Sequence, residues 1–333
     1  MSDSHPFRPS VEQLPADAAR PLWSVMIPTY NCAAYVRETL SSVLEQDPGP
    51  AEMQIEVVDD GSSDNPESVV DELGSGRVEF HRQPRNTGHV HNLNTCIVRS
   101  RGRLVHLLHG DDTVRDGFYR TMAPHLVDRP DVGAAFCRYI SMDADGSWET
   151  IGPLETGGRG ILDDWLSRIA LGQRLQTPCM VVRRSVYEQL GGFDARLTHS
   201  EDWEMWTRIA ASFPVSYEPE PLALYRVHEQ SATDRSRRSA DNVVDLRLAI
   251  EINRGRLTPE RADEITARAL EITAVTAIRR AGRMLHAGNP AAARAQVREA
   301  LKTSRSPAVL ERLAFFSALW LRHGVRRLLR GSS

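Results

Sequence analysis

The sequence lacks the features of a membrane-spanning or exported protein. Across its 333 residues, no run reaches the roughly 20 apolar residues that a membrane-spanning helix needs. The first 21 residues contain acids and prolines instead of an apolar run, so they do not form a secretory signal peptide. We therefore expect a cytoplasmic protein that is either soluble or lies peripherally on the inner face of a membrane.

Cysteine is scarce, and a strong net charge is absent. The four cysteines, at positions 32, 96, 137 and 179, do not show the paired spacing of a zinc or redox site, so we expect reduced thiols. A formal net charge of −3 gives the whole molecule no attraction to nucleic acid or anionic lipid. We expect no nucleic-acid partner, and any basic patch must be local.

The glycine-rich motifs of common nucleotide sites are missing as well. The chain contains neither the GxxxxGK[ST] pattern nor a GxGxxG segment that opens a helix after a strand. A diphosphate could then be held only by side chains together with a metal ion. This absence favours sites built from carboxylates.

The chain does contain an alternation of short apolar segments and segments with helical spacing. Strands are expected at 23–27, 55–58, 77–80 and 104–108, and helices at 33–45, 66–73 and 90–99. This order predicts an α/β fold in which helices cover both faces of a mostly parallel sheet. Ligands of such sheets bind at the carboxyl ends of the strands.

The composition divides the chain into three parts. Residues 1–21 read as a flexible leader rich in Pro, Asp and Ser. Residues 22–235 contain the α/β pattern, and the chain then becomes rich in Ala and Arg with helix-start signals such as Thr258-Pro259. We expect residues 236–333 to form a C-terminal all-α region.

Polar residues follow three of the expected strands. These segments are Pro28-Thr29-Tyr30-Asn31, Asp59-Asp60-Gly61-Ser62 and His109-Gly110-Asp111-Asp112. A tyrosine ring can stack on a base, and a pair of aspartates offers hard oxygen ligands for Mg²⁺ or Mn²⁺. One such loop could be an ordinary turn or helix cap. Three of them on one sheet edge favour a binding site.

A fourth polar segment opens a later helix. His199-Ser200-Glu201-Asp202-Trp203-Glu204 places three carboxylates in one helical turn. Acids are favourable at the positive end of a helix, which is one explanation. The other is that one carboxylate is a general base. The segment alone leaves both open.

Taken together, these segments resemble glycosyltransferase family 2, the inverting enzymes with the GT-A fold. The resemblance covers roughly residues 22–230. It rests on the three strand ends and on Asn86-Thr87-Gly88 with Asn94, Arg101-Gly102, Gly191-Gly192-Phe193-Asp194 and Glu201-Asp202-Trp203. The order and spacing of so many pieces make the match specific.

The resemblance implies a role for each matching position. Asp202 would be the catalytic base, assisted by Glu201, and the metal, Mn²⁺ or Mg²⁺, would be held by Asp111, Asp112 and His228. The residues implied to bind the nucleotide-sugar are Pro28, Thr29, Tyr30, Asn31, Asp59, Asp60, Asn86, Gly88, Asn94, Gly110 and Asp111. The implied reaction is transfer of a sugar, from a UDP-sugar in the first place, to a carbohydrate, lipid-linked or other small hydroxyl acceptor.

One departure from the family pattern and one missing signature bear on this interpretation. His109 stands where the family has an aspartate; it could ligate a transition metal but cannot supply the carboxylate's charge. The signature of processive synthases is absent, which implies a single addition, with cell-surface polysaccharide or glycoconjugate assembly as the family-level role. Two alternatives remain: a catalytically impaired nucleotide-sugar-binding or scaffolding protein, and a nucleotidyltransferase, whose glycine-rich loop is missing.

The last helix allows two interpretations. Residues 313–329 contain large apolar side chains together with a late cluster of arginines, so residues 306–330 could lie on anionic lipid. Alternatively, the apolar residues pack on the preceding helices and the arginines are solvated. The sequence favours the second interpretation, because the helical region needs a core of its own. The oligomeric state is left open.

Overall fold

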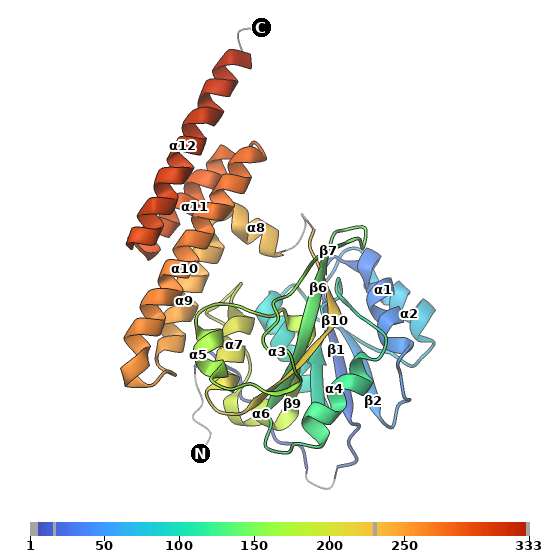
Figure 1. Cartoon of the computed structure of the whole chain (residues 1–333). Coiled ribbons are helices and arrows are strands. Elements are labelled where there is room, and N and C mark those ends of the chain that lie inside the picture. Colours follow the sequence, from blue (N-terminus) through green and yellow to red (C-terminus); the bar gives the residue numbers. More distant parts are fainter. Residues whose placement is uncertain (1–5, 16–17, 229–231, 331–333) are drawn as a thin grey trace. The chain divides into compact units, whose positions relative to one another are not determined.

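The computed structural model describes residues 6–15, 18–228 and 232–330, with side chains described throughout these ranges except at 232–233, 319 and 321–330. The chain divides into two compact units. The first comprises Met1–Trp165 and Gln173–Val227, and the second Leu166–Gly172 and His228–Ser333. Figure 1 shows both units, the first built on a sheet and the second on helices.

One half of the sheet in the first unit is parallel. The strand order is β3-β2-β1-β4-β9-β6-β10-β5. The parallel strands are β1 (Trp23–Thr29), β2 (Met53–Asp59), β3 (Glu79–Arg82) and β4 (Leu104–Leu107). Every residue of β1 and β2 is buried, as expected for strands covered on both faces. All four strands expected from the sequence are therefore present, and the third begins two residues later than expected.

The other half of the sheet is mixed. Its strands are β5 (Thr113–Val114), β6 (Ala134–Met142), β7 (Trp148–Ile151), β8 (Gly160–Ile161), β9 (Met180–Arg183) and β10 (Val215–Arg226). Strand β9 runs antiparallel between β4 and β6, and β10 runs parallel to β6. The β6–β10 register shifts between Glu218 and Ala223, where Pro221 cannot donate a ladder hydrogen bond. Because of this irregularity, the sequence of β10 does not show the apolar pattern that predicts a strand.

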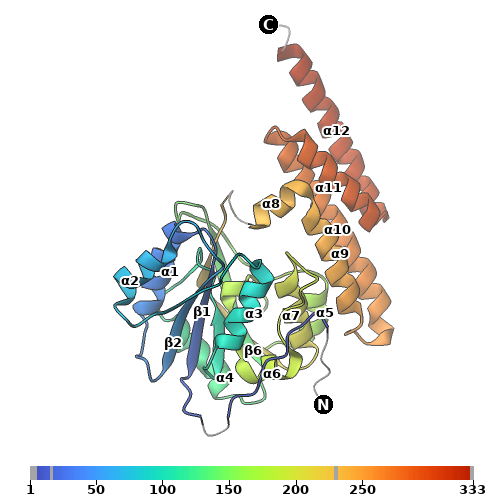
Figure 2. The same ribbon diagram turned by 180° about the vertical axis from the view of Figure 1, so that it is seen from behind.

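Helices cover both faces of the sheet. They are α1 (Ala33–Leu44), α2 (Pro66–Gly74), α3 (His89–Arg99), α4 (Phe118–Val127), α6 (Arg184–Leu190) and α7 (Glu201–Ala210), with a short 3₁₀ turn at Thr177–Cys179. Helix α4 packs on β6 and β10, whereas α3 packs on β1 and β2. Figure 1 shows α4 in front of the sheet, and the reverse view in Figure 2 shows α3 in front. The predicted α/β architecture is confirmed.

Part of the expected leader packs within the first unit. The backbone of Pro9 accepts a hydrogen bond from Gly192 N at 2.8 Å, and Phe7 O accepts one from Ala195 N at 2.8 Å. Arg8 forms an ion pair with Asp194 at 3.2 Å. Residues 7–9 therefore line the segment 191–195 and stabilise it.

The second unit is helical. It contains α8 (Ala232–Ser239), α9 (Asp241–Arg254), α10 (Pro259–His286), α11 (Pro290–Thr303) and α12 (Pro307–Arg330), and α5 (Trp165–Ala170) begins at the end of the first unit's long segment. Proline occupies the first position of α10, α11 and α12, where its missing N–H costs nothing. The core contains many alanines, which let these helices approach closely. The expected C-terminal helical region is present.

The described part of α12 packs on its own unit. Val309 and Phe316 are buried in the helical core, and Leu313 and Trp320 pack against it. These contacts support the interpretation in which the apolar residues face the preceding helices. The late arginines (322, 326, 327 and 330) lie outside the described side chains. Among the described residues, no helix has the length and apolar character needed to cross a bilayer.

Candidate active site

Three strand ends lie side by side at one edge of the sheet. Thr29 at the end of β1 pairs in register with Asp59 at the end of β2, and Asp60 N donates to Thr29 O at 2.9 Å. On the other side of β1, Gly110 N donates to Pro28 O at 3.0 Å. The polar segments that follow β1, β2 and β4 therefore meet, as parallel neighbours must.

Gly110 is where two of these segments approach most closely. A Cβ atom at this position would lie 2.8 Å from Thr29 Oγ1 and 3.0 Å from Cys32 Sγ. Thr29 Oγ1 and Cys32 Sγ are themselves 2.8 Å apart. Burial, together with the charge of Asp111, raises the pKa of Cys32 to about 12, so the thiol stays protonated. The cradle formed here accepts only glycine at position 110.

The segment after β1 presents an aromatic ring beside a locked turn. Asn31 adopts a positive φ of 50° and ties the turn to the next loop: its N–H donates to Ser62 Oγ and its Oδ1 accepts from Ser63 N, both at 2.8 Å. The neighbouring Tyr30 is 46% exposed. A fixed backbone with a solvent-accessible ring is suited to stacking on a base.

The two aspartates after β2 have separate partners. Asp59 is fully buried and accepts a hydrogen bond from Arg82 Nε at 2.9 Å. Asp60 accepts from Thr87 N and Thr87 Oγ1, both at 2.7 Å, and from Gly88 N at 2.9 Å. Asp60 therefore fastens the 87–88 turn to the sheet edge, and with it the start of α3. Asn86, just before this turn, is exposed.

Asn94 lies deeper, in the middle of α3. Its Nδ2 donates to Phe193 O at 3.1 Å, and its Oδ1 accepts from Phe193 N at 2.7 Å. A Cβ at Gly192 would lie 2.3 Å from the same Oδ1. Both ends of the amide are thus used to hold the 191–194 segment against α3. Any contact of Asn94 with a nucleotide-sugar stays a prediction.

The segment after β4 groups three potential metal ligands. One ligand atom from each of His109, Asp111 and Asp112 lies within 4.8 Å of the others. His109 Nε2 and Asp112 Oδ2 are buried without a hydrogen-bond partner among the described residues. Orphaned buried atoms of this kind are costly unless a ligand satisfies them.

The electrostatics of this group also favour a bound cation. Burial, with the nearby His89, lowers the pKa of His109 to about 4, which leaves a neutral imidazole that can act as a ligand. Burial and the charge of Asp111 raise the pKa of Asp112 well above its usual range. A divalent ion would relieve the repulsion between the two carboxylates. His109, Asp111 and Asp112 therefore form a fitting donor set for Mn²⁺ or Mg²⁺.

Arg226, at the end of β10, fixes the position of the metal-ligand candidates. Its backbone N–H donates to Asp112 Oδ1 at 2.8 Å, and its Nε donates to Asp111 O at 2.9 Å. The same guanidinium donates to Ala144 O at 2.9 Å and to Glu38 Oε2 at 2.6 Å. It is almost fully buried. Sequence reasoning did not single out this arginine.

Helix α7 provides the buried carboxylate predicted to be the base. Asp202 is 8% exposed, and its Oδ2 accepts hydrogen bonds from Gln173 Nε2 at 2.6 Å and Thr177 Oγ1 at 3.2 Å. Its Oδ1 accepts from Trp203 N at 2.6 Å. Burial, and next the charge of Glu201, raise the pKa of Asp202 to about 7. A carboxyl group with a pKa near 7 can take up a proton near neutral pH.

His89 connects the carboxylates of α7 with the metal-ligand candidates. Its Nε2 lies 3.0 Å from Glu201 Oε1, and its ring meets the His109 ring edge-on at a centroid distance of 5.1 Å. Partial shielding from water alone would lower the pKa of His89, whose side chain is still 37% exposed, but Glu201 outweighs it and the pKa rises. Burial alone would raise the pKa of Glu201, but His89 outweighs it and the pKa falls. The two groups form a charged pair that joins both clusters.

The structure thus brings together most of the residues singled out in the sequence. His228 is the first residue of the second unit, so its metal role stays a prediction. His89 and Arg226 are the additions. Neither is singled out by a motif, and the contacts of His89 with Glu201 and of Arg226 with Asp112 join residues more than 100 positions apart in the sequence.

The comparison with family models decides the affiliation. Residues 24–191, half of the chain, match the model described as glycosyl transferase family 2. The chain belongs to glycosyl transferase family 2. The predicted glycosyltransferase is therefore confirmed at the level of the family.

Relatives of this glycosyltransferase include proteins without an established activity. An uncharacterized protein of Mycobacterium tuberculosis is 32% identical over 240 residues, which cover 68% of this chain and 74% of the relative. An uncharacterized glycosyltransferase of Rickettsia typhi is 28% identical over 222 residues, covering 64% of this chain and 66% of the relative. The second relative supports the family, and both leave the substrates open.

Solved structures support the fold of the glycosyltransferase. S. aureus TarS 1–349 in complex with UDP-GlcNAc aligns with a TM-score of 0.61 at 16% identity, covering 84% of this chain and 91% of that one. A mannosyltransferase of Pyrobaculum calidifontis in complex with GDP-Man and Mn²⁺ aligns with a TM-score of 0.58 at 22% identity, covering 93% and 84%. In a longer TarS structure, the match spans 43% of that chain. The predicted GT-A fold is confirmed.

Proposed function

We propose that this glycosyltransferase moves a single sugar from a nucleoside-diphosphate sugar to an acceptor hydroxyl, with inversion at the anomeric carbon. The observation that carries the proposal is the contact of His89 with both Glu201 and His109. Through this contact, Glu201 and its neighbour Asp202 come near the proposed cation ligands, which supports a shared site at the edge where three strand ends meet. Metal, leaving group and base can then act on one sugar.

The donor would lie along the ends of β1, β2 and β4. Tyr30 would stack on the base, and Asp59 and Asp60 with the neighbouring turns would surround the base and ribose. The other proposed contacts are Pro28, Thr29, Asn31, Asn86, Gly88, Asn94 and Gly110. Of the two fold neighbours, TarS was solved with UDP-GlcNAc and the mannosyltransferase with GDP-Man, which supports a nucleotide-sugar here. We take a UDP-sugar as the first candidate.

The proposed metal site uses Asp111 and Asp112, with His109 as a nitrogen ligand and His228 as a further candidate. A bound Mn²⁺ or Mg²⁺ would neutralise charge on the departing nucleoside diphosphate. Imidazole is a better ligand for Mn²⁺ than for Mg²⁺, so His109 favours manganese. One fold neighbour was solved with Mn²⁺, which is consistent with this choice.

The proposed chemical step is a single in-line displacement. Asp202 accepts the proton of the acceptor hydroxyl while that oxygen forms a bond to the anomeric carbon. The bond from this carbon to the diphosphate oxygen breaks, and both electrons leave with the nucleoside diphosphate. Gln173 and Thr177 hold Asp202 in position through its Oδ2. Glu201, paired with His89, keeps a negative charge next to the base and so keeps its pKa high.

The first test is a thermal-shift screen of UDP-, GDP-, CDP- and dTDP-sugars with and without Mn²⁺, followed by donor hydrolysis. We expect one nucleotide class to raise the melting temperature only with metal and then to be hydrolysed slowly. Binding without hydrolysis or transfer would favour the alternative, a nucleotide-sugar-binding scaffold protein. No shift with any donor would contradict the proposed site.

The cellular role is also a proposal. The four cysteines are free thiols, which agrees with the expected cytoplasmic compartment. A single-addition enzyme of this family fits assembly of cell-surface polysaccharide or glycoconjugates, with a carbohydrate or lipid-linked acceptor. Activity on a panel of such acceptors, scored by the mass of the product, would test the assignment.

A further inference from the structure

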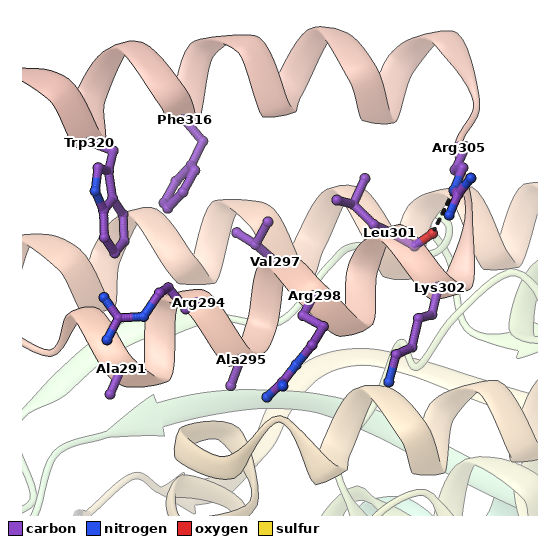
Figure 3. A pocket seen from close by; sticks show the side chains of 10 residues that line it. All are labelled: Ala291, Arg294, Ala295, Val297, Arg298, Leu301, Lys302, Arg305, Phe316 and Trp320. Carbon is purple, nitrogen blue, oxygen red and sulfur yellow. Dashed lines mark hydrogen bonds between the residues drawn. The ribbon is translucent and has the colours of Figure 1, made fainter.

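A groove lies between α11 and α12 in the helical unit (Figure 3). Its volume is about 860 Å³, and a row of cations from α11 and the residues after it lines one side: Arg294, Arg298, Lys302 and Arg305. The first three repeat every four residues, so they share one helix face. None of the ten described residues that line the groove is acidic. Lys302 is paired with Glu299, which lies outside the lining, at 2.7 Å. The described lining residues themselves therefore supply no counter-charge to the cationic row.

The other part of the groove is apolar. Val297 and Leu301 of α11 face Phe316 and Trp320 of α12, and Figure 3 shows both aromatic rings pointing from α12 towards α11. The Arg294 guanidinium lies over the Trp320 ring, 5.6 Å from its centroid. Cations beside an aliphatic and aromatic floor match a ligand with an anionic end and a hydrocarbon end.

The charge of this region departs from that of the chain. From Pro290 to Arg330 there are nine Arg or Lys residues and two Glu, a net charge of 9 − 2 = +7. The whole chain carries −3, so all other residues together carry −10. The positive charge is therefore concentrated on α11, α12 and their connection. This basic region is local, as the small net charge of the whole chain implies for any basic patch.

We propose that this groove binds anionic phospholipid at a membrane surface, with the phosphate on the cationic row and an acyl chain on the apolar floor. A nucleic acid would use the cations but would leave the floor of Val297, Leu301 and Phe316 unoccupied. A lipid uses both parts of the groove. The proposal does not depend on the donor, metal or base assigned to the first unit.

The test is co-sedimentation of the full chain with vesicles of phosphatidylcholine alone and with vesicles in which a third of the lipid is phosphatidylglycerol. We expect binding to the second kind only. Arg294→Glu/Arg298→Glu should weaken it at least about tenfold, since each cation near the surface contributes about 1 kcal/mol. The matched control, Arg279→Glu/Arg283→Glu on α10, changes the same charge at the same spacing outside the groove and should weaken binding clearly less.

A second measurement addresses the acyl chain. Lipids brominated on the acyl chain should quench tryptophan fluorescence of the wild type, and Trp320→Phe should remove most of this quenching. Equal binding to both kinds of vesicle, or equal loss in the test and control variants, would overturn the proposal. The proposal would also be overturned if Arg294→Glu/Arg298→Glu weakened binding to a double-stranded DNA fragment but left binding to vesicles unchanged. Retained quenching in Trp320→Phe would overturn the placement of the acyl chain.

Discussion

The two units of this glycosyltransferase place their charges in opposite ways. In the sheet unit, Asp112, Glu201, Asp202 and Arg226 are all less than 9% exposed. In the helical unit, the main core cluster consists of alanine and larger apolar residues, and cations such as Arg298 lie at the surface, although Asp245 is also only 8% exposed. Buried charges destabilise a fold unless they are paired, whereas surface charges are nearly neutral for stability. Charges in the sheet unit should therefore matter for chemistry and stability, and those of α11 for binding alone.

The largest expected effect follows from removing the buried carboxylate of Asp202, the proposed base. Asp202→Asn should reduce the turnover number about 10³-fold, because the amide cannot accept the acceptor's proton. Donor affinity, measured by titration calorimetry, should stay within about twofold, since the shape of the side chain is retained. The exposed Asp116→Asn serves as the control with unchanged activity. A collapse of donor affinity in Asp202→Asn would mean that Asp202 holds the donor.

The same substitution should stabilise the fold at alkaline pH. The pKa of Asp202 rises from an ordinary 3.8 to about 7 on folding, so the wild type loses stability as the pH rises through this window. We compare the free energies of unfolding of Asp202→Asn and the wild type, both without metal and donor. The difference in favour of the variant should be about 2–3 kcal/mol larger at pH 8 than at pH 5. Urea unfolding at both pH values measures this gain. An equal gain at both would exclude a buried, proton-linked carboxyl.

A steric test contrasts a glycine of each unit. Gly192→Ala forces a Cβ to within 2.3 Å of Asn94 Oδ1 and should cost about 1–3 kcal/mol. In the helical unit, Gly255 has right-handed helical backbone angles, and its Cβ would meet nothing closer than 3.7 Å. Gly255→Ala should therefore change stability by less than about 1 kcal/mol, and in the favourable direction. Equal costs at both positions would contradict the close packing of α3 on the 191–194 segment.

A smaller effect concerns the pH profile of the reaction. Asp202 must be ionised to act as a base, so kcat/KM should rise with pH and level off above about 7. The charge of Glu201 helps to raise the pKa of Asp202, so Glu201→Gln should shift this limb to lower pH. Glu72→Gln, which alters a surface carboxylate, should leave the profile in place. A limb that moves to higher pH in Glu201→Gln would refute the proposed influence of Glu201.

The smallest effect is expected in the helical unit. Arg294→Glu/Arg298→Glu should change the free energy of unfolding by less than about 1 kcal/mol, because both side chains are exposed. Chemical denaturation of the double variant and of Arg279→Glu/Arg283→Glu gives the comparison. A loss of several kcal/mol in the first variant alone would show that the cationic row is part of the core.

The sequence predicted the parallel half of the sheet better than the mixed half. Strands β1 and β2 are uninterrupted apolar runs, which is the pattern of strands buried on both faces. Strand β10 includes Pro219 and Pro221 and changes register, so neither alternation nor a continuous run marks it. The antiparallel insertion of β9 depends on packing between segments far apart in the chain, which local patterns do not contain.

The candidate site shows the same limit. The aspartates after β2 and β4 could be found because they follow recognisable strands. His89 could not, because a single histidine at a helix start has no periodicity and its partner Glu201 lies 112 residues later. The orphaned atoms of His109 and Asp112 likewise emerge only in three dimensions. Motifs locate the parts of the site, and tertiary contacts determine how they are joined.

The carboxylate of Asp60 has a consequence for the order in which substrates bind. It anchors Thr87 and Gly88, the two residues immediately before the histidine that pairs with Glu201. A nucleotide that engages Asp60 must therefore act on the backbone that orients this pair. We expect sequential kinetics in which the donor enters first and the nucleoside diphosphate leaves last. This order predicts that the nucleotide inhibits competitively against the donor but not against the acceptor. A random order of binding would show that Asp60 and the His89–Glu201 pair are not coupled through the 87–88 turn.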